Sequence, residues 1–269
     1  MAITALHAAA SGMRALDEQL NVVANNLANI NTHGFKRSRV NFEDLLYQAK
    51  REPGVPNAQD EPVPHGIVVG TGVKVSGTQL NFAPGSIDQT DKPLDLAIEG
   101  EGFFQVTAIQ DGQQITAYTR AGNFVRNSQG NVVLGNSEGA QLEPTVTIPD
   151  GVTNITVGRN GELRVREPGS PALTTVGQVQ LARFVNAEGL RQIGRNLYQE
   201  TDASGPPVVG NAESDGMGAI VQGQLEMSNV DPVRELIDLI TTQRAFEMNS
   251  QSIRAADQSL EVVSNLRRV

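Results

Sequence analysis

The first 31 residues carry a seven-residue repeat of apolar side chains. The first series of the repeat is Leu6, Met13, Leu20 and Leu27. A second series follows three residues behind it: Ala9, Leu16, Val23 and Ile30. This pattern is typical of a helix that packs against another helix through a narrow apolar stripe. A helix of this length spans ~45 Å, too long for a small core. The repeat therefore predicts a helix over residues 1–31 that needs a helical partner.

The end of this helix is marked by glycine and by basic residues. Gly34 is expected to end the helix as a left-handed cap. Lys36, Arg37 and Arg39 lie just beyond it, and positive charge stabilises the C-terminus of a helix. The polar face is rich in amides: Asn21, Asn25, Asn26 and Asn29. Asparagine is a mediocre helix former. This face is therefore either packed against neighbouring chains or merely tolerated, and both interpretations stay open.

The far end of the chain supplies the partner. Asp231 and Pro232 are typical of an N-cap and a first helical residue. A second heptad series follows them: Leu239, Phe246, Ile253 and Leu260, with Ala256 and Val263 three residues after the last two. Thr242 and Asn249 take other stripe positions, so this stripe is less apolar than the first. We expect one helix from about 232 to 266, paired with the first. The predicted assembly seam is Leu6, Met13, Leu16, Leu20, Val23, Leu27, Ile30, Leu239, Phe246, Ile253, Leu260 and Val263.

The residues between the helices have a different composition. Residues 46–66 hold four prolines and little to bury, which predicts a loop or an extended arm. From residue 67 to about 227, short apolar pieces with β-type residues alternate with turn signals such as Asn160-Gly161. We therefore predict an α+β fold: paired terminal helices (1–45 and 228–269), a Pro-rich arm (46–66) and a middle domain of short antiparallel strands (67–227).

Composition excludes several classes of function. The net charge of −9 argues against nucleic acid and against an anionic membrane surface. The chain has no cysteine, and its three histidines have no partner at metal-ligand spacing, so we expect neither a metal nor a cofactor. The chain contains neither a Gly-x-Ser-x-Gly elbow nor a Cys/His pair, so the sequence does not predict an enzyme. The N-terminus lacks the basic start and continuous apolar block of a cleaved signal.

Three stretches resemble the axial proteins of the bacterial flagellum, the rod and hook family. The first is residues 22–37, VVANNLANINTHGFKR. The second is residues 94–106, LDLAIEGEGFFQV. The third is residues 228–250, which begin SNVD and end QRAFEMNS. The positions that carry the resemblance are Asn25, Asn26, Asn29, Gly34, Phe35, Asp95, Gly102, Phe103, Asn229, Gln243 and Arg244.

The resemblance implies a structural subunit without catalysis or cofactor, located in the flagellar basal body and spanning the periplasm. Residues 42–48 and 196–201 are similar to distal rod members, which form a rigid hollow tube that transmits torque from motor to hook. The implied partners are further copies of the chain, proximal rod proteins, hook or hook-junction proteins, the surrounding ring proteins and the flagellar type III export apparatus. Nucleic acid and direct membrane insertion are not expected. The resemblance also suggests that the arm stiffens the tube.

Two alternatives remain open. Within the family, the chain could be a proximal rod or hook protein. Outside it, a secreted β-rich adhesin with a coiled-coil stalk would share both helices and strands. Such a stalk is usually one continuous helix, whereas this seam is divided between the two ends of the chain.

Overall fold

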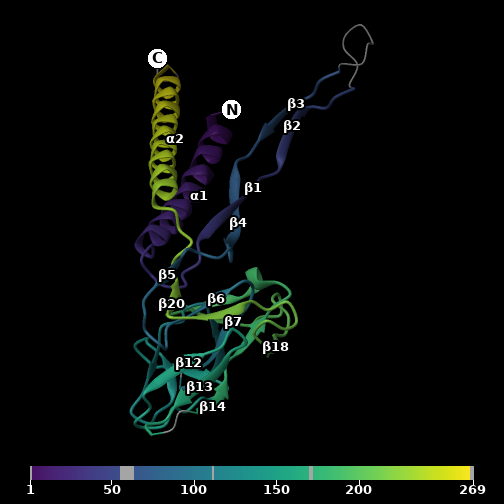
Figure 1. Ribbon diagram of the computed structural model, residues 1–269. Helices are drawn as coiled ribbons and strands as arrows, with labels where there is room; N and C mark the ends of the chain where they lie inside the picture. Colours follow the sequence, from purple (N-terminus) through teal and green to yellow (C-terminus); the bar gives the residue numbers. More distant parts are fainter. Residues whose placement is uncertain (1, 55–63, 111, 170–171, 267–269) are drawn as a thin grey trace. The chain divides into compact units, whose positions relative to one another are not determined.

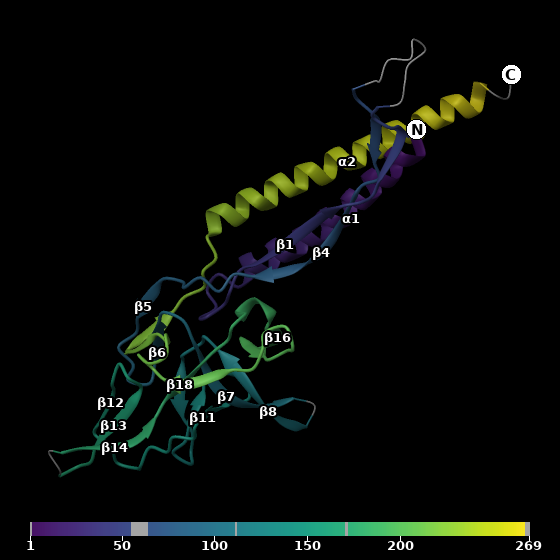
Figure 2. The same ribbon diagram turned by 90° about the vertical axis from the view of Figure 1, so that its right-hand side faces the viewer.

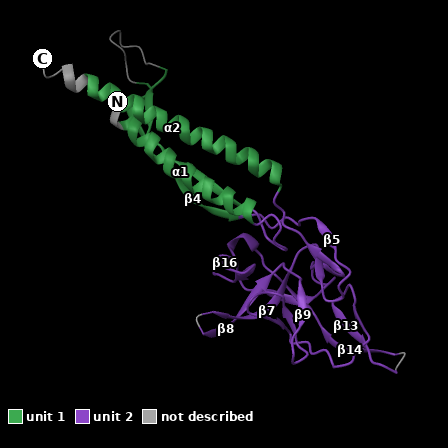
Figure 3. Cartoon of the chain, turned by 90° about the vertical axis from the view of Figure 1, so that its left-hand side faces the viewer, with its two compact units in different colours: residues 1–28, 38–79, 231–269 green, residues 29–37, 80–230 purple. Residues whose placement is uncertain are grey.

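A computed structural model describes residues 2–54, 64–110, 112–169 and 172–266. The chain forms two compact units (Figure 3). Unit 1 comprises residues 1–28, 38–79 and 231–269, and unit 2 comprises residues 29–37 and 80–230. Helices of unit 1 and antiparallel strands of unit 2 confirm the predicted α+β class. The domain limits given above stay a prediction; strand β1 (Ser38–Asp44) falls inside the 1–45 range.

Two long antiparallel helices dominate unit 1. α1 (Ala2–Ala28) and α2 (Pro232–Leu266) lie side by side (Figures 1 and 2). Asn26 Nδ2 donates to Glu235 Oε2 over 3.2 Å, and a Cβ on Gly12 would lie 3.2 Å from Asn249 Nδ2. From Asn26 to Gly12 is 14 residues backward along α1, and from Glu235 to Asn249 is 14 residues forward along α2. These two pairs fix the antiparallel register.

The start of α2 confirms the sequence prediction, and the end of α1 corrects it. Asp231 Oδ1 accepts hydrogen bonds from the backbone N–H of Val233 (3.0 Å) and Arg234 (3.3 Å), as an N-cap does. α1 ends at Ala28, not at residue 31. Thr32 bonds Asn29 through both backbone and side chain and folds the chain into turns. Gly34 lies beyond these turns, so its prediction as a helix cap is wrong.

Strands complete unit 1. β1 pairs with β4 (Val73–Leu80), and β2 (Tyr47–Arg51) pairs antiparallel with β3 (Ile67–Gly70). Figure 2 shows β1 and β4 beside α1. The Pro-rich arm predicted over residues 46–66 therefore contains strand β2 and is followed directly by β3, and its residues 55–63 lie outside the described part.

Unit 2 is built from short strands. In chain order they are β5 (Ile87–Gln89), β6 (Leu96–Glu99), β7 (Phe103–Gln110), β8 (Gln113–Thr119), β9 (Phe124–Arg126), β10 (Val132–Leu134), β11 (Gln141–Glu143), β12 (Asn154–Val157), β13 (Glu162–Arg166), β14 (Leu173–Gln178), β15 (Gln180–Arg183), β16 (Arg191–Gly194), β17 (Leu197–Gln199), β18 (Val208–Asn211), β19 (Ala219–Gln222) and β20 (Gln224–Glu226). In the described residues the largest sheet has nine strands, in the order β16-β17-β8-β7-β11-β10-β9, with β15 joining β7 to β18.

The core of unit 2 lies around β7. Successive residues of β7 point to opposite faces, so Phe104 enters a large aliphatic cluster while Phe103 enters an aromatic one. Phe103 makes edge-to-face contacts with Phe82, Phe184 and Tyr198, with ring centroids 5.2 to 6.0 Å apart. Such pairs contribute about 0.5–1.5 kcal/mol each beyond the apolar area that they bury. This gives unit 2 a core of its own.

Candidate assembly surface and connector clamp

The N-terminal half of α2 carries apolar side chains that unit 1 does not cover. Five of them form what we call the α2 stripe: Val233, Leu236, Ile237, Ile240 and Met248. Val233 is 64% exposed and Ile237 is 54% exposed. An isolated helix in water would carry polar residues on such a face. Contiguous exposed apolar surface marks an interaction site in soluble proteins. The α2 stripe is therefore a candidate assembly surface.

The predicted seam residues are brought together only in part. Val23 is buried, whereas Leu6, Met13, Leu16, Leu20, Leu27, Leu239, Phe246 and Ile253 are half-buried, and Leu260 is exposed. Ile30 lies past the end of α1 and is half-buried, and the side chain of Val263 lies outside the described part. The most buried positions of the pair include Ala15, Asn26 and Thr242. The role of the seam in assembly stays a prediction.

One residue of the amide-rich face is fully packed. Asn26 Nδ2 donates to Ser38 O (2.8 Å) and to Glu235 Oε2, while its Oδ1 accepts from Ser38 N (3.0 Å). Both Asn26 and Glu235 are buried, so these bonds satisfy polar groups that water cannot reach. Asn21 and Asn25 are exposed and Asn29 is half-buried. Asn26 is therefore packed within its own chain, and packing of the amide-rich face against neighbouring chains stays a prediction.

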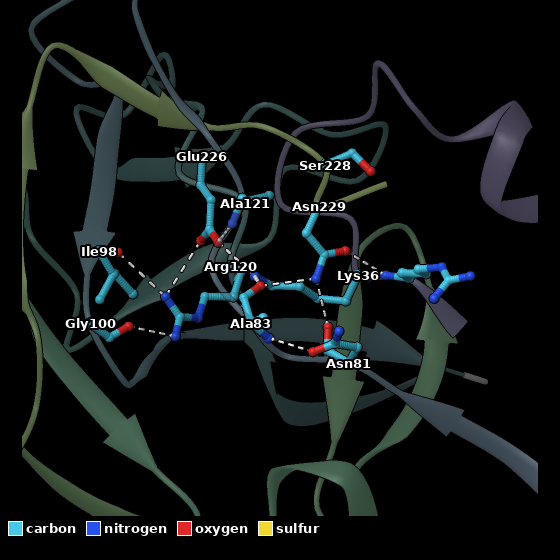
Figure 4. A network of polar contacts seen from close by, with 12 residues as sticks. Lys36, Asn81, Ala83, Ile98, Gly100, Arg120, Ala121, Glu226, Ser228 and Asn229 are labelled. Carbon is cyan, nitrogen blue, oxygen red and sulfur yellow. Dashed lines mark hydrogen bonds and ion pairs between the residues drawn. The ribbon is translucent and has the colours of Figure 1, made fainter. Parts of the chain in front are cut away.

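Unit 2 contains a buried ion pair between segments that are far apart in the sequence. Lys36 Nζ donates to Glu226 Oε1 over 2.6 Å and to Ala83 O over 2.8 Å (Figure 4). Glu226 Oε1 also accepts from Gly85 N (3.0 Å). The Lys36 and Glu226 side chains are 0% and 1% exposed. Lys36 was expected beside a helix end; that interpretation is wrong, because a carboxylate 190 residues away holds it in the interior.

A second buried cation shares the same carboxylate. Arg120 Nη1 lies 3.4 Å from Glu226 Oε2, and its Nη2 donates to Gly100 O over 2.8 Å. The guanidinium also lies over the Phe103 ring, 5.4 Å from its centroid. Burial lowers the pKa of Lys36 and of Arg120, and in both cases Glu226 opposes the shift. Two cations therefore face one carboxylate, and backbone carbonyls supply the remaining negative charge.

Asn229 ties the same segments by neutral hydrogen bonds. Its Oδ1 accepts from Arg37 N (2.7 Å), and its Nδ2 donates to Asn81 O (2.8 Å) and Ala83 O (2.9 Å). Asn81 N in turn donates to Arg37 O (2.9 Å). We call Lys36, Arg120, Glu226 and Asn229 the connector clamp, because Lys36 and Asn229 each join three segments: 34–37, 81–85 and 226–229.

Gly34 is required by the close approach of two backbones. Its φ is +69°, and a Cβ there would lie 2.5 Å from Ala121 N. Its own N–H donates to Glu226 O over 2.8 Å. Phe35, the next residue, is buried. The absence of a side chain at Gly34 therefore lets the 34–37 segment pack directly against the backbone of Arg120 and Ala121.

The other motif residues divide between unit 2 and the surface of α2. Asp95 accepts from Thr90 Oγ1 (2.6 Å), Gly102 has a φ of +132°, and Phe103 lies in the aromatic cluster. Gln243 and Arg244 are exposed on α2. Sequence reasoning missed Arg120 and Glu226 as site residues. Lys36 lay inside a quoted motif, but nothing local to it indicated burial.

The described residues show neither a metal site nor a membrane span. In that part of the chain, no three His, Asp or Glu side chains gather as metal ligands would. Neither described helix has a stretch long and apolar enough to cross a membrane. The ionisable side chains of the connector clamp are buried. This arrangement is suited to holding chain segments together.

Comparison with known proteins finds similarity along most of the chain. Residues 6–36 match the family described as flagella basal body rod protein. Residues 97–165 match the flagellar hook protein FlgE/F/G D1 domain, and residues 221–266 match the flagellar basal body rod FlgEFG protein C-terminal family. The flagellar basal-body rod protein FlgG of Caulobacter vibrioides is 46% identical, over 98% of this chain and 99% of its own length. The FlgG proteins of Agrobacterium fabrum (44% identical; 97% and 98%) and Buchnera aphidicola subsp. Schizaphis graminum (42%; 98% and 100%) are similar over comparable lengths.

Proposed function

Because this chain belongs to the flagellar basal-body rod protein family, we propose that it is a structural subunit of the distal rod. In this role it polymerises into a rigid hollow tube that transmits torque from motor to hook. The proposal includes no catalysis and no cofactor. Family membership locates the chain in the basal body of the flagellum, where the rod spans the periplasm.

The observation that carries this proposal is the α2 stripe. The five apolar side chains of this stripe stay exposed in the single chain, and burying one such side chain contributes ~1.5–3 kcal/mol. Half-buried seam residues add apolar surface on both helices. A helical polymer would cover these surfaces with neighbouring copies. Proximal rod, hook or hook-junction proteins, the ring proteins and the export apparatus are the further partners that we propose.

Polymerisation of the purified chain tests the proposal. Concentrated parent protein is expected to form tubes in negative-stain electron microscopy and to sediment as polymer. Ile237→Asp in the α2 stripe, and Leu20→Asp or Ile253→Asp in the seam, should abolish tubes because a carboxylate at a buried contact costs far more than it gains. Gln113→Asp, at an exposed position of β8, is the matched control.

The outcomes of this experiment distinguish the proposed function from its alternatives. Tubes formed equally by the three variants and by Gln113→Asp would show that neither surface is an assembly interface. Isolated rods or lollipop-shaped particles from the parent would favour the adhesin alternative. Near-UV circular dichroism of Tyr118 and Tyr198, both buried in unit 2, checks that each variant keeps unit 2 folded.

A further inference from the structure

The connector clamp lies where the chain passes from unit 2 into unit 1. The chain crosses between the units next to residues 29, 37, 80 and 230. Arg37 N donates to Asn229 Oδ1 (2.7 Å), and Asn229 Nδ2 donates to Asn81 O (2.8 Å; Figure 4). Asn81 N donates back to Arg37 O (2.9 Å). This closed set of hydrogen bonds brings three of the four crossing points together.

The segment that follows α1 is held at the same place. Asn196, in the turn between β16 and β17, donates from Nδ2 to His33 O over 3.2 Å. Gly34 N donates to Glu226 O over 2.8 Å. Only residues 29–32 therefore separate the end of α1 from a firmly attached segment. All of these contacts join residues of unit 2, so the clamp does not require that unit 1 be folded.

We propose that the connector clamp holds the attachment points of unit 1 together before unit 1 folds, and thereby lowers the concentration at which the chain polymerises. In dilute monomer α1 and α2 are unpaired tails, but both tails start from the clamp. Residues 38–79 form a loop whose two ends are held there as well. This rests on the proposed function, because unit 1 then folds as the subunit joins the end of a polymer.

The expected effect follows from the length of chain that separates the two helices. With the clamp closed, residues 29–34 and 226–231 connect α1 to α2 through the Gly34–Glu226 hydrogen bond, a path of about twelve residues. If residues 33–37 detach, α1 is joined to unit 2 only from Leu80 onward, and the path becomes about 60 residues. The chance that the ends of a loop meet falls with the 3/2 power of its length, so the local concentration of one helix near the other falls about tenfold.

Gly34→Val is designed to open the clamp. A Cβ at residue 34 would lie 2.5 Å from Ala121 N, and its φ of +69° is one that β-branched residues avoid. When the segment detaches, Glu226 keeps Arg120 as its partner, so no carboxylate is left unpaired. Gly205→Val is the matched control: its φ of +72° imposes similar backbone strain, but a Cβ there meets nothing within 4 Å.

Fluorescence energy transfer measures whether the clamp is closed in the monomer. The chain contains no cysteine, so Asn31→Cys and Arg234→Cys, both at exposed positions, carry the two dyes. Phe35 O accepts from Asn229 N over 3.4 Å, and the chain on either side can then separate the labelled residues by at most about 35 Å. About 200 residues of unfolded chain separate them by at least about 80 Å.

Transfer is measured at a dilution where sedimentation shows only monomer. It should be high in the parent and in Gly205→Val, lower in Gly34→Val, and lowest in urea. The critical concentration for polymerisation is then measured by sedimentation of the chains without dye. It should be on the order of tenfold higher for Gly34→Val than for Gly205→Val.

A second pair of variants serves if Gly34→Val leaves transfer high or loses the near-UV signal of Tyr118 and Tyr198. Asn229→Ala removes the three hydrogen bonds of Asn229 and should shift both measurements in the same direction. Asn186→Ala is its control, because Asn186 Nδ2 also donates to a backbone carbonyl of unit 2, Ala203 O at 3.0 Å, away from the clamp.

Three results would count against the proposals, and they are distinct. Transfer in the parent monomer as low as in urea would mean that the clamp forms only in the polymer, which would overturn this inference. Equal critical concentrations for the clamp variant and its control, with transfer lowered and the near-UV signal retained, would overturn it as well. A parent chain that forms no polymer at any concentration would instead overturn the proposed function.

Discussion

Two substitutions in the connector clamp should lower the free energy of unfolding by unequal amounts, although each removes one member of the same ion pair. Glu226→Gln keeps the shape of the side chain but leaves the ammonium of Lys36 and the guanidinium of Arg120 buried without a carboxylate. Lys36→Met keeps the length of the side chain and leaves one cation facing one carboxylate. We predict that Glu226→Gln is far more destabilising.

The expected magnitudes follow from the partners that remain. Removing one member of a buried pair costs about 3–5 kcal/mol when its partner is left uncompensated, and this applies to Glu226→Gln. After Lys36→Met, Ala83 O still accepts from Asn229 Nδ2, and Glu226 still has Gly85 N and Arg120. Replacing buried charge by apolar volume is then close to neutral, within about 1 kcal/mol. We expect a gap of at least ~2 kcal/mol between the variants.

Urea denaturation followed by near-UV circular dichroism measures these free energies in the full chain, since Tyr118 and Tyr198 report on unit 2. The double variant Lys36→Met/Glu226→Gln should be more stable than Glu226→Gln alone, because it removes one uncompensated cation. Lys36 lies closer to the carboxylate (2.6 Å) than Arg120 does (3.4 Å). If Lys36→Met proved as destabilising as Glu226→Gln, Lys36 would be the essential counter-ion and the reasoning would be refuted.

Three other predictions follow from the fold. In dilute monomer, α1 and α2 should be cleaved by limited proteolysis before unit 2, because helices with unfilled apolar faces depend on packing; intact helices after digestion of unit 2 would contradict this. Gly34→Ala should cost at least ~1 kcal/mol more than Gly205→Ala in urea denaturation, since both glycines have left-handed φ but only Gly34 abuts backbone. Burial and Glu200 raise the pKa of Tyr118 to about 12, so its contribution to the free energy of unfolding is present below pH ~10 and lost as pH rises toward 12. The stability gap between the parent and Tyr118→Phe should therefore shrink across that interval, and a constant gap would argue against a raised pKa.

Features set by neighbouring residues were predictable from the sequence. The N-cap at Asp231 and the span of α2 needed only local chemistry and period. The pairing of the two helices followed from two apolar stripes that each lacked a cover, whereas their antiparallel direction came only from the structure. The β character of the middle came from turn signals at short intervals.

Features set by distant residues were not predictable. β6 pairs with β19, with Ile98 opposite Ile220, and no local pattern specifies that match. Lys36 follows a helix, so local reasoning assigned it to the helix end. Its burial depends on Glu226 and Ala83, which become neighbours only when unit 2 is folded. Buried charge is decided by such long-range partners.

The two helices of unit 1 are unequal, and the inequality has a consequence for growth. In the register set by Asn26 and Glu235, the first residue of α1, Ala2, stands opposite residue 259, whereas α2 continues to Leu266. Leu260 and Val262, 40% and 59% exposed, belong to this protruding turn. No residue of α1 stands opposite this protruding turn, and contacts between unlike surfaces of identical subunits build an open helical filament when the rotation between them does not close a ring. In the rod that we propose, a subunit that covered this step would present the same step again, so each addition would leave the end of the filament ready for the next subunit.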